Sequence, residues 1–198
     1  MVSLRDAQKQ LTRSRLVEAA ADSFRVRGYA ATTIEDVASG AGATRATFYL
    51  HFRTKADLID EVMAVVRRDA FELNERLDGV VRAGDRESVR AWLDAAFDFW
   101  DVVGPYAIAE EEAASLDADT RRTRSSQFTA GVAAIVRGLV ARDGGNEDEC
   151  RVRAVLAYAQ LQSVFHRWMR VGWDIDRNDA LEVMTDMWMT ALGKRSVR

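Results

Sequence analysis

The chain contains 198 residues, of which 48% are apolar and 30% are charged, and its formal net charge is −3. This apolar content allows a sizeable core, while one proline, twelve glycines and the lack of alternating β-branched runs favour helices with short connections. No apolar run reaches membrane-spanning length, and Cys150 is the only cysteine, which excludes an intrachain disulfide. The polar, charged N-terminus differs from a signal peptide, so we expect a soluble, cytoplasmic protein.

The charges are distributed unevenly along the chain. Residues 1–55 contain nine basic and five acidic residues, a net charge of +4, so the remainder carries −7. A basic head on an acidic body fits contact with nucleic acid at one end of the molecule. A chance fluctuation of surface charge would give the same pattern, so the charge asymmetry alone does not establish contact with nucleic acid.

Residues 1–11 are predicted to form a flexible arm. Either its basic residues, Arg5 and Lys9, contact DNA phosphates, or the arm stays disordered. The first helix is expected from about residue 12 to residue 27, and Gly28 ends it.

Two short helices joined by a tight turn are predicted between residues 33 and 50. Thr33 is a suitable N-cap for the first helix, and Asp36 follows three residues later to return the capping contact. Gly42 can adopt the positive φ that ends a helix, and Thr44 caps the second helix. A helix this short cannot stand alone, but it fits the major groove of DNA and reaches base edges with its N-terminal residues.

A DNA-contacting surface is predicted on and beside the second short helix. Thr44 and Arg45 lie at its N-terminal end and are expected to read bases, whereas the flanking residues mainly hold phosphates. Tyr49 alternatively belongs partly to the core, and Lys55 starts the next helix beside backbone N–H groups that suit a phosphate oxygen. The predicted DNA-binding residues are Thr33, Thr44, Arg45, Thr47, Tyr49, His51 and Lys55.

From about residue 12 to residue 60 the chain resembles the TetR family of transcriptional regulators. Residue types and spacing both match at Arg15-Leu16-Val17-Glu18-Ala19-Ala20, Phe24, Arg27-Gly28-Tyr29, Thr32-Thr33, Val37-Ala38, Ala41-Gly42, Phe48-Tyr49, His51-Phe52, Thr54-Lys55 and Leu58. Ala43 and Ala46 depart from the usual larger aliphatic residue and glycine, and we expect altered operator preference rather than lost DNA binding. The resemblance implies a homodimer that sets two recognition helices into successive major grooves of a near-palindromic operator. It also implies a small-molecule effector that binds in the body and releases DNA.

Six further helices are expected after the head, which makes nine in an all-α, TetR-like architecture. They span about residues 55–77, 86–103, 106–115, 118–142, 147–171 and 178–192, with a loop at 79–84 and a break at Gly104-Pro105. The acidic run Glu110–Glu112 either binds a cation or basic partner or, more commonly for such runs, forms a solvated face. We divide the chain into a helix-turn-helix DNA-binding domain, residues 1–56, and a ligand-binding and dimerisation domain, residues 57–198.

The last two expected helices both carry broad apolar surfaces. The helix at 147–171 is apolar around most of its circumference, which predicts burial on two sides. The resemblance implies that these two helices pair with their copies in an intersubunit four-helix bundle. We assign Met184 and Trp188 to the dimer interface or its immediate support, and ordinary core packing is the alternative.

Two polar side chains, Gln162 and His166, lie one helical turn apart inside the apolar arc of the helix at 147–171. They either bond to each other, to backbone or to the partner subunit, or they orient a ligand in an otherwise apolar pocket. The implied effector is a mostly apolar small molecule with one or two hydrogen-bonding groups, and a cationic molecule is the alternative. The predicted ligand-binding residues are Trp92, Phe99, Phe128, Tyr158, Gln162 and His166.

These features predict a ligand-responsive transcriptional repressor that binds double-stranded DNA as a homodimer. The alternative is a DNA-binding activator or architectural protein without an effector. An enzyme is not expected, because the chain has two histidines and no nucleophile elbow, phosphate loop or metal-ligand cluster. For the same reason we expect no catalytic residue, cofactor or metal site.

Overall fold

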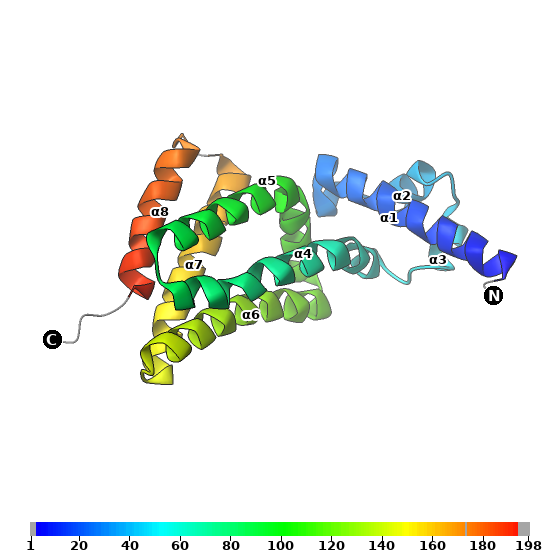
Figure 1. Ribbon diagram of the computed structural model, residues 1–198. Coiled ribbons are helices and arrows are strands. Elements are labelled where there is room, and N and C mark those ends of the chain that lie inside the picture. The colour runs from blue at the N-terminus through cyan, green and yellow to red at the C-terminus, as the bar shows by residue number, and fades with distance from the viewer. Residues whose placement is uncertain (1–2, 173, 194–198) are drawn as a thin grey trace. The chain divides into compact units, whose positions relative to one another are not determined.

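The computed structural model describes residues 3–172 and 174–193, and over these residues the fold is all-α (Figure 1). Its helices are α1 (Leu4–Ala31), α2 (Ile34–Gly40), α3 (Arg45–Tyr49), α4 (Lys55–Ala83), α5 (Arg86–Leu116), α6 (Ala118–Asp143), α7 (Glu147–Val171) and α8 (Arg177–Leu192). The predicted fold class is confirmed. None of the helices in these two described ranges is both long enough and apolar enough to cross a membrane.

The helices pack into two compact units. Among the described residues, the first contains 3–67 and 105–124, so it joins α1, α2, α3 and the start of α4 to the end of α5 and the start of α6. The second contains the described residues of 68–104, 125–172 and 174–193, with the rest of α4, α5 and α6 and all of α7 and α8. These units are defined by packing, whereas the predicted boundary at residue 56 divides the chain by function and stays a prediction.

The first unit is built around one apolar core. Leu16, Ala20 and Phe24 recur every four residues on α1, so that one face of this helix is apolar. They belong to one core with Phe48 of α3 and Leu58 of α4, and none of the five is more than 1% exposed. Val37 of α2 lies in the same core and is 0% exposed, so burial holds both short helices, α2 and α3, which could not persist alone.

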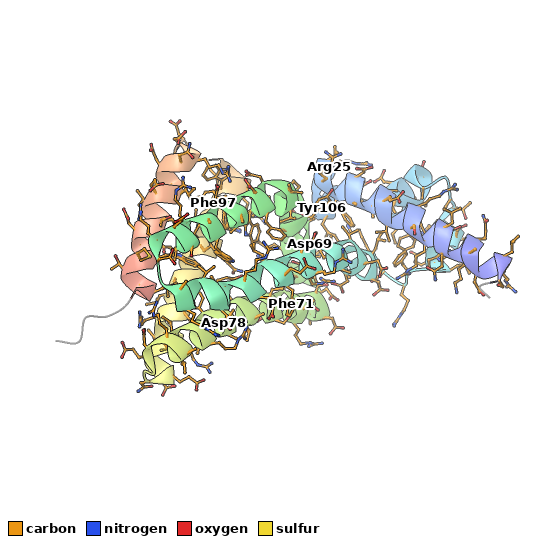
Figure 2. The ribbon with its side chains drawn as sticks, viewed as in Figure 1. Arg25, Asp69, Phe71, Asp78, Phe97 and Tyr106 are labelled. Carbon is orange, nitrogen blue, oxygen red and sulfur yellow. The ribbon has the colours of Figure 1, made fainter. Side chains whose placement is uncertain are left out.

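The second unit has an aromatic core. Phe97 of α5, labelled in Figure 2, meets Phe165 of α7 edge-on with ring centroids 4.9 Å apart. Trp100 stacks on Phe165 at 5.2 Å, and Trp92 stacks on Trp188 of α8 at 5.3 Å. Such ring pairs contribute about 0.5–1.5 kcal/mol beyond the area they bury, so they hold α5 to α7 and α8.

Helices α4 and α6 approach each other closely in the second unit. A methyl group at Gly138 of α6 would lie 2.7 Å from the Cβ of Val81 and 2.8 Å from the carbonyl oxygen of Asp78, both on α4. Beside this point Arg137 of α6 pairs with Asp78, which is labelled in Figure 2, at 3.9 Å. The missing side chain at position 138 therefore lets the two helices meet near their backbones.

The N-terminal residues differ from the predicted arm. Helix α1 begins at Leu4 because Ser3 caps it, accepting a hydrogen bond from the Asp6 backbone N–H at 3.1 Å. The prediction of a flexible arm is therefore wrong for residues 3–11, while residues 1–2 lie outside the described part. Gly28 leaves the helical conformation with a φ of 78°, at the position where the sequence placed the end of the first helix.

The predicted loop at 79–84 is wrong over most of its length. Helix α4 continues to Ala83, because Val80 and Val81 extend its apolar stripe and Val81 is only 1% exposed. The chain leaves the helix at Gly84, where φ is 67°.

Residues predicted as two separate helices form the single helix α5, which carries Gly104 and Pro105 inside it. Pro105 lacks a backbone N–H and so removes one hydrogen bond from the helix. The boundary between the two compact units falls at this position. The parts of α5 before and after Pro105 correspond to the two predicted helices, so each of the nine predicted segments lies in a helix of the described chain.

The acidic run Glu110–Glu112 is not simply a solvated face. Glu110 is 3% exposed and pairs with Arg67 of α4 at 3.1 Å. Burial raises the pKa of the Glu110 carboxyl group, and the Arg67 charge opposes that rise. Glu112 accepts a hydrogen bond from the backbone N–H of Ala30 at 3.0 Å. The run therefore joins α5 to α1 and α4 within the first unit.

Candidate nucleic-acid interface

Helix α2 begins with a complete capping box, as predicted. Thr33 Oγ1 accepts a hydrogen bond from the Asp36 backbone N–H at 3.1 Å, and the Asp36 carboxylate accepts one from the Thr33 N–H at 2.9 Å. Arg27 of α1 pairs with the same carboxylate at 3.1 Å. These contacts, the hydrogen bonds from Thr33 before that from Arg27, lower the pKa of Asp36 to about 2. The Thr33 side chain is thus engaged in the cap, and its predicted phosphate contact stays untested.

Gly42 sets the turn between α2 and α3. Its φ of 63° lies in the left-handed region that favours glycine. The Ala43 N–H donates to the Ala38 carbonyl at 2.8 Å, and the Gly42 N–H donates to the Ser39 carbonyl at 3.0 Å. This pair of bonds is a Schellman helix ending, which fixes the direction in which the chain leaves α2.

Helix α3 is little more than one turn, and it is held from both ends. Thr44 caps its start by accepting a hydrogen bond from the Thr47 backbone N–H at 3.1 Å. Phe48 and Phe52 anchor the other side in the core, with exposures of 0% and 3%. Thr44 and Arg45, the two predicted base-reading residues, are both exposed at the start of the helix. The structure therefore brings them together on an accessible surface.

Arg45 is engaged by two neighbouring side chains. Its Nη1 pairs with the carboxylate of Glu35 on α2, and its Nη2 donates to the Tyr49 hydroxyl at 3.3 Å. The guanidinium carbon lies 5.7 Å from the centre of the Tyr49 ring. The hydrogen bonds with Tyr49 and with Glu35 raise the pKa of Arg45. Sequence reasoning missed Glu35, because its partner lies ten residues away on another helix.

The ammonium group of Lys55 is bound inside the first unit. Its Nζ donates to the carbonyl oxygens of Tyr29 at 2.5 Å and Thr32 at 2.8 Å, and lies 4.1 Å from the centre of the Tyr29 ring. Partial burial lowers the pKa of this ammonium group. Two backbone N–H groups before α4, predicted to suit a phosphate, instead donate to the Asp57 carboxylate at 2.9 and 3.1 Å. The protein's own groups therefore fill this site, and the predicted Lys55–phosphate contact stays untested.

Arg13 of α1 is a positioning residue that the sequence reasoning missed. Its guanidinium group donates to the His51 carbonyl oxygen and to Glu61, each at 3.0 Å, and lies 4.2 Å from the centre of the Phe52 ring. Arg13 therefore ties α1 to the end of α3 and to α4. Arg13 lies three residues before the buried Leu16, so both residues are on one face of α1. This spacing is the feature of the sequence that could have identified Arg13.

His51 is half-buried beside this contact. Burial, and then the charges of Lys9 and Arg13, lower the pKa of its imidazole. Its Nδ1 atom is buried and has no hydrogen-bond partner among the described residues. The predicted contact of His51 with a phosphate stays untested.

The predicted ligand-binding residues all belong to the second unit. Trp92 and Tyr158 are 5% and 7% exposed. The Trp92 indole N–H donates to the Leu73 carbonyl at 2.9 Å, and the Tyr158 hydroxyl donates to Asn74 Oδ1 at 3.1 Å. Burial raises the pKa of the Tyr158 hydroxyl. Phe128 meets the Tyr158 ring edge-on at 5.6 Å, so these two predicted residues are in contact.

The other three predicted ligand-binding residues, Phe99, Gln162 and His166, are half-buried. Phe99 packs edge-on against Trp100 at 6.0 Å, whereas Gln162 and His166 lie one turn apart on α7. Asn74 is a buried polar residue that the sequence reasoning missed, although it falls within the apolar stripe of α4. A role of these groups in ligand binding stays a prediction.

The predicted dimer residues, Met184 and Trp188, lie in the core of the second unit. They are 4% and 0% exposed, which fits immediate support of an interface and not direct contact with a partner. Apart from Val171 at the end of α7, the exposed large apolar residues of α7 and α8 are Val152, Val155, Leu156, Val183 and Met187, and we call these five the α7–α8 apolar face. A contact of 2.9 Å from Gln160 Nε2 on α7 to Met187 Sδ on α8 brings the two helices together on this side.

Two capped helices joined by a glycine turn, with the second anchored by buried aromatic rings, define a helix-turn-helix head in an all-α protein. The family model described as "Bacterial regulatory proteins, tetR family" matches residues 16–62, which include all of α2 and α3. The head of the chain therefore matches the TetR family over these residues. Regulators of this family bind DNA and are typically dimeric, with small-molecule effectors.

Curated relatives match this chain over different lengths. The HTH-type transcriptional regulator TtgR of Pseudomonas putida is 37% identical over 87 residues, which cover 44% of this chain and 38% of TtgR. The repressor KstR2 of Rhodococcus jostii is 27% identical over 81% of this chain and 78% of its own length. The activator FasR of Mycolicibacterium smegmatis is 28% identical over 86% of this chain and 78% of its own length. The chain thus spans well under half of TtgR and about three-quarters of the other two.

Among solved structures, SmeT has a similar fold. SmeT, the repressor of the Stenotrophomonas maltophilia multidrug efflux pump SmeDEF, superimposes with a TM-score of 0.70 at 22% identity. The match covers 96% of this chain and 94% of SmeT, and at this identity it concerns the fold alone. The relatives and the fold are those of transcriptional regulators, which are not enzymes.

Proposed function

We propose that the protein is a ligand-responsive transcriptional repressor that binds a near-palindromic DNA operator as a homodimer and acts in the cytoplasm. The presentation of Thr44 and Arg45 at the start of α3 carries this proposal, since buried Phe48 and Phe52 hold that helix with its opposite side accessible. Such a helix can insert its N-terminal residues into a major groove. The match of residues 16–62 to the TetR family model and the names of the curated relatives give further support.

A selection experiment tests DNA recognition. The purified protein is incubated with a library of random DNA duplexes, and bound duplexes are amplified over several rounds and sequenced. We expect enrichment of one sequence with two related half-sites, because a symmetric dimer reads both strands alike. An Arg45→Ala variant carried through the same rounds is the control. A wild-type protein that enriches no sequence would refute the proposed function.

The α7–α8 apolar face is proposed to bind a second copy of the chain. Leu156 and Val183 are 66% and 60% exposed on the two helices that pair in TetR-like dimers. Leu156→Glu should give a monomer in sedimentation experiments, because dimerisation would bury its charge. The matched control is Val102→Glu on α5, whose 72% exposed side chain lies outside this face. A monomeric wild type at micromolar concentration would refute the homodimer.

The effector is proposed to be a small, mostly apolar molecule bound beside Phe128, Tyr158, Gln162 and His166. The ring contact between Phe128 and Tyr158 and the half-buried polar groups of α7 support this site. The test measures release of the selected duplex by a panel of apolar compounds that carry one carbonyl, carboxylate or amine group. Gln162→Leu and Phe128→Ala should raise the concentration needed for release. Trp92 is a poorer test position, because its loss from the core would cost about 3–5 kcal/mol of stability.

An activator of transcription is the alternative function, because relatives of both kinds resemble this chain. The named activator FasR and the named repressor KstR2 resemble this chain to a similar degree. Transcription in vitro from a promoter that carries the selected duplex separates the two. We expect addition of the protein to lower transcript yield, whereas an increase would assign activation.

A further inference from the structure

We infer that Glu35 on α2 determines the specificity of the head by holding Arg45 ready for a base contact and keeping it from acting as a general phosphate contact. This inference rests on the proposed DNA binding and deepens it. Glu35 belongs to a different helix from Arg45, and only the fold brings the two side chains together.

Glu35 and Tyr49 hold the Arg45 side chain from two directions. The Glu35 carboxylate accepts from Nη1, the Tyr49 hydroxyl accepts from Nη2 at 3.3 Å, and the Tyr49 ring centre lies 5.7 Å from the guanidinium carbon. An arginine side chain is otherwise free to occupy many rotamers, and fixing one of them beforehand lowers the entropy lost on binding. The arginine is therefore ordered before it meets a base.

The held arginine keeps enough donors to read a base pair. A guanidinium group has five N–H donors, and these two contacts engage one on each terminal nitrogen. Three donors remain, and a bidentate contact with guanine O6 and N7 needs two of them. Base reading can therefore take place without breaking the pair with Glu35.

Capping does not explain the carboxylate at position 35. Thr33 and Asp36 already form both bonds of the capping box, and Asp36 also has its own cation in Arg27. A further negative charge in the first turn does favour the helix dipole. However, the Glu35 side chain is 57% exposed beside the α3 surface, where it also repels phosphates. Loss of general DNA affinity is the expected consequence of this charge.

The position of Glu35 makes that loss selective. A phosphate that approaches Arg45 must either displace the carboxylate or lie beside it, and both are unfavourable. A guanine edge carries no full charge and meets no such repulsion. Because both side chains are largely exposed, the pair should change an equilibrium by about 1.5- to fivefold per head and not by orders of magnitude. The effect is therefore expected in the ratio of specific to non-specific affinity.

Glu35→Gln tests the inference with Glu18→Gln as its matched control. Glutamine at position 35 would keep the size and the oxygen acceptor of the native residue without its charge. Glu18 is an exposed acid of the same unit, on α1, and has no ion pair among the described residues. Each variant is titrated with the duplex enriched by the wild type and with a scrambled duplex of the same composition, at several salt concentrations. Thermal unfolding confirms that both variants are folded.

We expect Glu18→Gln to raise both affinities alike, because it only removes a negative charge. Glu35→Gln should raise the affinity for scrambled DNA further, so that its ratio of selected to scrambled affinity falls about 1.5- to fivefold per head. In an Arg45→Ala background the same change should leave the ratio unaltered. Equal ratios for Glu35→Gln and Glu18→Gln would overturn the role of Glu35 while the proposed function stands. A wild type that enriches no duplex would instead remove the proposed function, and the role of Glu35 with it.

Discussion

Replacing Gly138 with alanine should destabilise the second unit, although alanine is the better helix former. The added methyl group would lie 2.7 Å from Val81 Cβ and 2.8 Å from the Asp78 carbonyl oxygen, and ordinary contacts there are longer than 3.4 Å. Neither atom is the end of a flexible side chain, so relief requires α4 and α6 to move apart. Gly79 of α4 is the matched control, because a methyl group there meets no atom within 4 Å.

The expected changes in stability on substitution by alanine have opposite signs at Gly79 and Gly138. Alanine gains about 1 kcal/mol over glycine inside a helix, and Gly79→Ala should show most of that gain. Overpacking a well-filled contact costs about 1–3 kcal/mol. Gly138→Ala should therefore be about 1–3 kcal/mol less stable than Gly79→Ala. For a chain of this length, that difference corresponds to about 2–12 °C in Tm.

Thermal unfolding followed by circular dichroism measures this difference directly. A third variant, Gly138→Ala with Val81→Ala, separates the causes of the clash. Val81→Ala removes the side-chain methyl groups but leaves Cβ and the Asp78 carbonyl oxygen in place, so it should not restore stability. Equal Tm values for Gly138→Ala and Gly79→Ala would refute the close approach of α4 and α6.

Three further predictions concern the head. The folded pKa of Asp36, about 2, lies below its usual value of 3.8, so its stabilising contribution is complete above pH 3.8 and is lost as the pH falls through 2; acid titration by circular dichroism should therefore show a larger loss for the wild type than for Asp36→Asn in this range. Gly42→Ala should destabilise the head by about 1–2 kcal/mol because φ is 63°, and Gly42→Asn should cost less in the same thermal assay. Arg45→Ala should lower affinity for the selected duplex by about five- to 150-fold and relax specificity at one base pair, whereas equal losses on scrambled DNA would contradict base reading.

Local features of the head could be predicted from the sequence because each depends on residues close together in the chain. The capping box of Thr33 and Asp36 spans four positions, and the same is true of Thr44 and Thr47. Gly42 needs only its own backbone conformation to end α2. Such features need no knowledge of the fold, so their residue types and spacing were enough.

Contacts between distant residues could not be predicted in the same way. Helical periodicity marked Met184 and Trp188 as apolar, but it cannot say whether a partner subunit or the chain's own core covers them. Trp92, 96 residues before Trp188, covers it in this fold. Likewise Asn74 satisfies the Tyr158 hydroxyl from 84 residues away. Only the fold specifies which neighbour meets each face.

Lys55 is a charged residue whose role could not be predicted from the sequence. It either stabilises the first unit through the Tyr29 and Thr32 carbonyls or binds a DNA phosphate, and the two roles predict different measurements. Lys55→Met keeps the apolar stem but removes two charge-assisted hydrogen bonds to the Tyr29 and Thr32 carbonyls, which together should cost about 1–3 kcal/mol at this partly exposed site. The expected fall in Tm is about 2–12 °C. Arg53→Met, which removes an exposed charge two positions earlier, should leave Tm nearly unchanged.

The salt dependence of DNA binding then decides between the roles. Well below Tm, Lys55→Met should keep the slope of log affinity against log salt, because an ammonium group bound to two carbonyls releases no counterion from DNA. A phosphate contact predicts the opposite result, a slope smaller by about one per head with little change in Tm. That second result would mean that the ammonium group leaves the end of α1 when DNA binds. Lys55 would then couple DNA binding to the conformation of the segment from Tyr29 to Thr32, which Glu112 also holds through Ala30.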